Sequence, residues 1–159
     1  MTPPPLQGIP STSLAELSAA SAQRAFAQLS RLQQELGRPL SRTARLLRTK
    51  AGWQPGLRSL LISDLYGAEL PVAGVPSMLS ARFQQLLVPL LAAWPQAAED
   101  PRITGVAAQL ATIAALEPAV RAGDDAACGQ ALGAAISVDL LLQELVHELA
   151  SSHATALHS

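Results

Sequence analysis

The chain has 159 residues, a formal net charge of −1, 49% hydrophobic residues and 14% charged residues. This hydrophobicity argues against disorder over the whole chain, and the length favours one domain, since domains cluster near ~100–150 residues. The near-neutral charge by itself points neither to a nucleic-acid binder nor to an acidic tail protein. Only 3% of the residues are aromatic, whereas leucine and alanine are abundant, and this bias predicts an all-α fold.

The domain organisation and the compartment follow from the termini and from cysteine usage. Residues 1–10 are rich in proline and lack the basic and apolar regions of a secretory signal, so we expect an extended tail. Residues 11–152 are predicted to form a single helical domain, followed by a frayed C-terminus at 153–159. The single cysteine, Cys128, excludes an intramolecular disulfide, and together these features favour a reducing, cytoplasmic location.

The first predicted helix begins at Ser13, which has the S-x-x-E spacing of a capping box with Glu16. Apolar residues then recur at steps of three and four as far as Leu36, which is typical of an amphipathic helix. Gly37 and Pro39 are expected to end it, since a C-terminal glycine followed by proline commonly terminates helices.

The middle of the chain contains shorter predicted elements. A second helix is expected at about residues 41–50 and a further helical stretch at 57–66, with a turn between them. Residues 67–76 contain two prolines and two glycines and form the longest predicted loop. A third long helix starts near Ser77, and Pro89 is expected to kink it or to end it.

The last two helices have the clearest local signals. Asp100 is a favourable N-cap residue and Pro101 a favourable first residue for the fourth helix, which Pro118 is expected to bend. Residues 122–125 combine a helix stop with a helix start and predict an antiparallel hairpin with a final helix that reaches at least Ala150. The expected fold is a compact bundle of about five to six helices.

The final helix is apolar on almost every side from residue 131 to residue 142, which is typical of a buried core helix. Charged residues interrupt its longest apolar stretch, so a membrane span is not predicted. Leu140 and Leu141 interrupt its narrow polar stripe, and Gly129 and Gly133 leave a shallow groove. Either another helix of the same chain covers these residues, or they form an interface with a protein partner or a second copy.

Basic residues are concentrated in one half of the chain, since eight of the eleven lie between Arg24 and Arg58. One interpretation is that they pair with acidic faces of later helices or remain solvated. The alternative is that they form an anion-binding face, because guanidinium groups bind phosphates well. Nucleic acid is a possible ligand but not a favoured one, because few aromatic side chains are nearby for base stacking. The candidate anion-binding residues are Arg38, Arg42, Arg45, Arg48, Lys50 and Trp53.

Catalytic motifs are largely missing from the sequence, which contains no phosphate-binding loop, no C-x-x-C and no H-E-x-x-H. Glu144 and His147 have the Glu-x-x-His spacing of helical di-metal sites, but no second such pair exists, and a solvated helix face explains them better. Glu117 and Asp139 would form a carboxylate pair if both were buried in one cavity. We therefore expect no catalytic residue, no metal and no cofactor.

These observations favour a non-enzymatic helical interaction module, such as an adaptor, a chaperone-like protein or a regulatory subunit, that binds a protein partner or itself. An anion or nucleic-acid binder that uses the basic stripe from Arg38 to Arg48 is the alternative. An enzyme or ligand carrier with a pocket inside the bundle is the third hypothesis.

Overall fold

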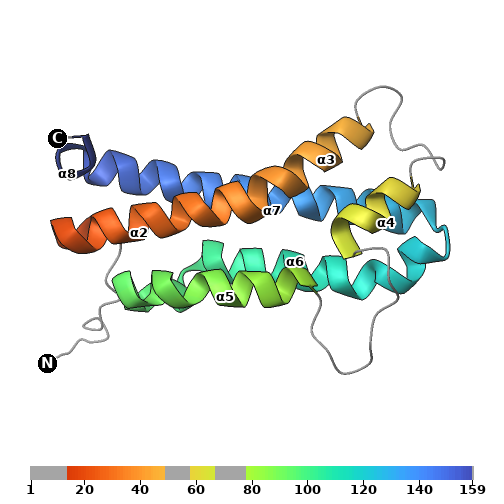
Figure 1. Cartoon of the computed structure of the whole chain (residues 1–159), viewed down its shortest axis with the longest axis horizontal. Coiled ribbons are helices and arrows are strands. Elements are labelled where there is room, and N and C mark those ends of the chain that lie inside the picture. The colour runs from red at the N-terminus through yellow and green to blue at the C-terminus, as the bar shows by residue number, and fades with distance from the viewer. Residues whose placement is uncertain (1–13, 49–57, 67–77, 159) are drawn as a thin grey trace, which may run out of the picture.

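The computed structural model describes residues 14–48, 58–66 and 78–158, and all regular structure in these ranges is helical. The all-α prediction is therefore confirmed. A front layer consists of α2 (Ala19–Leu32), α3 (Arg38–Arg48), α4 (Arg58–Tyr66) and α5 (Met78–Ala93), and α6 (Pro101–Arg121) and α7 (Asp125–Ser152) lie side by side behind it (Figure 1). The short elements are η1 (Leu14–Glu16), η2 (Gln33–Gly37), η4 (Pro95–Glu99) and α8 (Ala154–His158).

Helix α7 is the central element, and it packs against α2, α3 and α6. One side of it is a seam with alternating steps of three and four residues, and this inner seam is fully buried: Cys128, Ala131, Ala135, Val138, Leu142, Leu145 and Leu149. Burial of each leucine side chain contributes about 1.5–3 kcal/mol. By length and composition alone α7 could cross a membrane, but half of its apolar window is buried inside the protein, as in a core helix.

The first long helix differs from its prediction at both ends. It begins at Ala19, where Ser18 is the N-cap and its side chain accepts a hydrogen bond from the backbone N–H of Ser21 at 3.1 Å. The predicted cap, Ser13, lies outside the described residues. Leu14 to Glu16 form only a single 3₁₀ turn before this helix, so the expected start is too early.

Gly37 and Pro39 do not end the helix, because the chain continues from α2 through the π-helical segment η2 directly into α3. The wider π turn is closed by a hydrogen bond from the N–H of Arg38 to the carbonyl of Gln33. Proline lacks an N–H donor and its ring crowds the preceding turn, and a π bulge is one way to relieve this crowding. Leu32 and Leu40 are buried on either side of the bulge, so continuous packing favours one long helix over the predicted break.

Pro89 also lies within a continuous helix, because α5 extends to Ala93. The sequence predicted that Pro89 kinks the helix or ends it, and the structure shows that the helix does not end there. The carbonyl left without an N–H partner belongs to Gln85, an exposed residue that water can reach. The turn predicted before residue 57 and the loop predicted at 67–76 lie outside the described residues.

The predicted start of α6 and the turn after it are confirmed. Asp100 Oδ1 accepts a hydrogen bond from the backbone N–H of Arg102 at 2.8 Å. After α6 passes Pro118 and ends, Gly123 adopts a φ of 94°, which favours glycine. Asp124 then caps α7 by accepting a hydrogen bond from the N–H of Ala127 at 3.1 Å.

The segment that was expected to fray contains a further short helix. After α7 ends, α8 forms at Ala154–His158 and packs against α2 and α7. The Nε2 atom of His153 lies 2.6 Å from the carbonyl oxygen of Leu14. Since a carbonyl only accepts, the imidazole donates here, and this bond joins the two ends of the described chain.

Candidate interaction surfaces

The exposed sides of α6 and α7 form a surface that we call the rear face, because both helices pack against the front layer with their opposite sides (Figure 1). Between residues 103–116 of α6 and 126–143 of α7, the one charged residue is Asp139, and it is buried. The exposed residues of the rear face are Thr104, Ala108, Ala111, Thr112, Ala115, Ala126, Gln130, Leu140 and Gln143, with Gly129, Gly133, Ile136 and Ser137 partly exposed. This surface is therefore two helices wide and free of charge.

The part of the rear face on α7 repeats the periodicity of the buried seam. An outer seam of exposed or partly exposed residues follows alternating steps of three and four: Ala126, Gly129, Gly133, Ile136, Leu140, Gln143 and His147. At ~100° per residue this outer seam lies opposite the inner one. Helix α7 thus has two heptad-like seams, of which the described chain buries one.

The four predicted interface residues fall into two groups. A Cβ atom built on Gly129 or Gly133 would have no described neighbour within 4 Å, and Leu140 is 46% exposed. These three residues are open to a partner. Leu141 instead packs against α6, where its Cδ1 atom lies 3.1 Å from the position of a Cβ on Gly105. Leu141 therefore makes an internal contact between α6 and α7, unlike the other three residues.

An open recess lies beside Leu140 and is lined by Leu140, Gln143, Glu144 and His147. Glu144 and His147 are both exposed. Among the described residues there is no group of three or more histidine, cysteine, aspartate or glutamate side chains that could hold a metal ion. Among the described residues, Glu144 and His147 are therefore a pair of exposed side chains that belongs to no larger group of this kind.

Ion pairs border the rear face. The Arg102 guanidinium lies 3.2 Å from Asp100 Oδ1 and 2.5 Å from Glu148 Oε1, which ties the start of α6 to the end of α7. Burial lowers the pKa of Arg102, but the hydrogen bonds to Asp100 and Glu148 outweigh this effect and raise it. At the other end of α6, Glu117 and Arg121 form a pair at 2.8 Å. The uncharged surface is thus bounded by charges.

The basic stripe on α3 is exposed to solvent. Arg38, Arg42 and Arg45 lie on exposed positions, and none of the three has an ion pair with a described acidic residue. Arg45 Nε donates to Ser41 Oγ at 2.8 Å, which fixes one guanidinium against its own helix. Pairing with acidic faces of later helices is therefore not observed for these three. The side chain of Arg48, and all of Lys50 and Trp53, lie outside what the structure describes.

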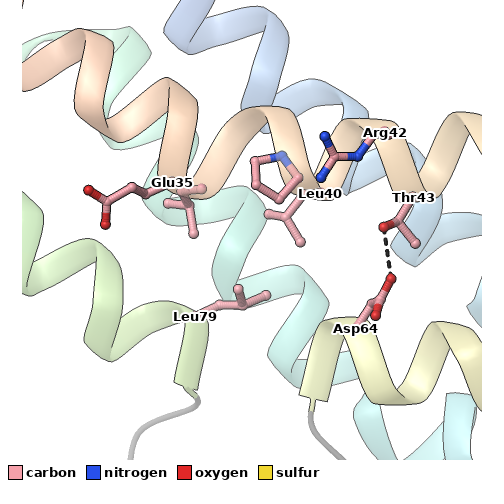
Figure 2. Close-up of a pocket in the computed structure, with 8 residues that line it drawn as sticks. Glu35, Leu40, Arg42, Thr43, Asp64 and Leu79 are labelled. Carbon is pink, nitrogen blue, oxygen red and sulfur yellow. Dashed lines mark hydrogen bonds between the residues drawn. The ribbon is translucent and has the colours of Figure 1, made fainter.

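A cavity of about 300 Å³ lies where α3, α4 and α5 meet (Figure 2). Its apolar lining is Leu36, Pro39, Leu40 and Leu79, and its polar lining is Glu35, Arg42, Thr43 and Asp64. Thr43 Oγ1 donates to Asp64 Oδ2 at 2.8 Å, as the dashed line in Figure 2 marks. This cavity was not predicted from the sequence. Two of its lining residues, Glu35 and Leu36, lie in the π-helical segment η2, which continues into α3 where a helix end was expected.

Glu35 is held at the edge of this cavity by two arginines. Arg31 Nε donates to its carboxylate at 2.6 Å, and Arg82 of α5 also forms an ion pair with it. The hydrogen bond from Arg31, with the contribution of Arg82, lowers the pKa of Glu35 below its ordinary value despite some opposing desolvation. Glu35 is therefore a bridge between α5 and the first long helix.

The two carboxylates considered as a possible pair have separate partners. Asp139 is 7% exposed and accepts a hydrogen bond from Gln33 Nε2 at 3.5 Å, at the contact of η2 with α7. Glu117 pairs with Arg121 on α6. Cys128 is fully buried, and burial raises the pKa of its thiol. The structure thus gives none of these groups a shared reactive site.

The fold and these surfaces define an all-α protein with an uncharged two-helix face. No protein-family model, no curated protein and no solved structure matches the chain.

Proposed function

We propose that the chain is a non-enzymatic helical interaction module that binds another protein chain through the rear face. The observation that carries this proposal is the absence of any exposed charge over the α6 and α7 parts of that face. Charged residues make up about a quarter to a third of a typical soluble surface. They are depleted at the cores of protein interfaces, where desolvation of a charge is costly.

The shape of the rear face supports the same function. Alanine, glycine and threonine cover most of it, so another backbone can approach both helices closely. Leu140 projects from this smooth surface with 46% of its area exposed. An apolar side chain that a partner can bury, surrounded by small residues, has the character of an interface anchor.

Site-specific photo-crosslinking tests this function. A benzoylphenylalanine would replace Ala108 on the rear face or, as the matched control, Val88 on α5 of the front layer, which is 67% exposed. In the cells that produce the protein, we expect protein adducts from position 108 and at least tenfold fewer from position 88. Equal yields at the two positions, or no adduct at position 108, would refute an interaction at the rear face.

An anion-binding function is the second candidate, and the exposed arginines of α3 favour it. Arg38 and Arg42 are separated by one helical turn and have no acidic partner among the described residues. Such a stripe would contact successive phosphates, with an affinity that falls as salt rises. Fluorescence anisotropy with a labelled DNA duplex tests it: Arg38→Ala with Arg42→Ala should weaken binding at least tenfold, whereas Arg24→Ala on α2 should not.

A further inference from the structure

We infer that the occupant of the rear face is a second copy of this chain, with the two α7 helices antiparallel across a two-fold axis. This inference rests on the proposed function and names the partner. The observation behind the inference is the order of side-chain sizes along the outer seam of α7. The first half of that seam is small, with Ala126, Gly129 and Gly133, and the second half is large, with Leu140, Gln143 and His147.

An antiparallel pair centred near residue 138 places each large side chain opposite a small one. Gly129 then faces His147 of the second copy, and Gly133 faces Gln143 of the second copy. Ile136 faces Leu140 of the second copy, so the centre of the contact is apolar. Each pairing occurs twice because the axis is two-fold, as in closed homodimers, and the seven-residue repeat keeps the seam in register.

The open space at the two glycines is what this pairing needs. Nothing described lies within 4 Å of a Cβ built on Gly129 or Gly133, so side chains of the second copy have room there. A parallel pair would place glycine opposite glycine and leucine opposite leucine, which leaves voids at one end and crowding at the other. Voids forfeit dispersion contacts, and therefore the antiparallel arrangement packs better.

Helix dipoles and area agree with this arrangement. The antiparallel pair sets the two helix dipoles in opposite directions, so that the partial charge at each end of α7 faces one of opposite sign. With α6 alongside, the face is roughly 20 Å wide and about 30 Å long, on the order of 600 Å² per copy. That area approaches the ~800 Å² per partner of a standard interface.

Sedimentation equilibrium of the purified full chain tests the association. We expect a mass approaching twice the 16.6 kDa of the chain at high micromolar concentration. Leu140→Glu, which sets a charge at the centre of the contact, should weaken association at least tenfold, and Gly133→Lys should act in the same direction. Val88→Glu, which adds the same charge to the front layer, should leave association unchanged. Circular dichroism checks that each variant remains helical.

Cross-linking with a short bis-maleimide tests the geometry. A mixture of Gly129→Cys and His147→Cys proteins should cross-link, whereas each alone should not, since equivalent residues then lie ~27 Å apart along the helices. Ser137→Cys, close to the axis, should cross-link with itself. The unmodified chain is the control, because Cys128 is fully buried.

The outcomes separate this inference from the proposed function. A monomer at high concentration, a dimer unaffected by Leu140→Glu, or self-cross-linking of Gly129→Cys would each overturn the antiparallel pair. If photo-crosslinking at position 108 then yields an adduct with a different protein, the rear face is still an interaction surface. If it yields none, the proposed function fails as well.

Discussion

Substitution of single glycines by alanine tests the packing of α7, because the free energy of unfolding should fall at one glycine and rise at another. At Gly37 a new Cβ would lie 3.1 Å from both Asp139 Oδ1 and Leu142 Cδ1, and 3.2 Å from the Cα of Asp139. The side-chain atoms can shift, but the backbone of α7 cannot do so without moving its own buried seam. At Gly129 the same Cβ would meet no described atom within 4 Å.

The magnitudes follow from these contacts. Overpacking a core contact costs about 1–3 kcal/mol, and alanine is better than glycine by about 1 kcal/mol inside a helix. Gly37→Ala should therefore lower the free energy of unfolding by about 0–2 kcal/mol, whereas Gly129→Ala should raise it by about 1 kcal/mol. The melting temperature should move by about 2–4 °C per kcal/mol for a chain of this size.

Urea denaturation followed by circular dichroism measures both values. The two substitutions should be made in the Leu140→Glu background, where association of the rear face no longer contributes to stability. We expect the two free energies of unfolding to differ by about 1–3 kcal/mol, with Gly129→Ala the more stable protein. Equal stabilisation by both substitutions would show that η2 and α7 do not approach each other as closely as the contacts at Gly37 require.

Three further substitutions test individual buried or capping groups. Asp139→Asn keeps the shape of the side chain and its hydrogen bond with Gln33 but removes a buried charge. The free energy of unfolding in urea should therefore stay the same or rise by up to about 1 kcal/mol. A decrease in this free energy would indicate a second partner for the carboxylate. Asp124→Ala removes the cap at the N–H of Ala127 and should cost about 1 kcal/mol in the same assay, more than Asp125→Ala. Burial raises the pKa of Tyr66, so the folded state keeps the phenol proton while the unfolded state loses it above about pH 10. The free energy of unfolding should therefore fall above that pH, and this fall should be shallower in Tyr66→Phe. At neutral pH Tyr66→Phe should cost about 1 kcal/mol, because it removes the hydrogen bond from the Tyr66 hydroxyl to the carbonyl of Ile113.

Local sequence signals were sufficient where a helix boundary depends on its own residues. The Asp100 cap and the turn at Gly123 each satisfy backbone groups within a few positions, so their outcome does not depend on the rest of the fold. Pro39 and Pro89 are different, because each lies between buried leucines whose packing favours a continuous helix. At these prolines tertiary burial outweighs a local helix-breaking tendency.

The surfaces were less predictable than the helices for a related reason. Leu140 and Leu141 are adjacent and chemically identical, yet one is exposed and the other packs on Gly105. Which leucine faces outward depends on where α6 lies, and no local pattern contains that information. Gly129 and Gly133 are visible in the sequence, but only the arrangement of the layers shows that no described atom lies within 4 Å of a Cβ built on either of them.

The two seams of α7, considered together, favour association of two copies. A helix that is apolar on nearly every side is normally buried on every side, but of the two seams the described chain buries only the inner one. The outer seam has the same alternating spacing but contains glycine, glutamine and histidine where the inner one contains leucine and valine. Obligate interfaces are more hydrophobic than this, so we expect the outer seam to form a reversible contact that dissociates on dilution while each copy remains folded.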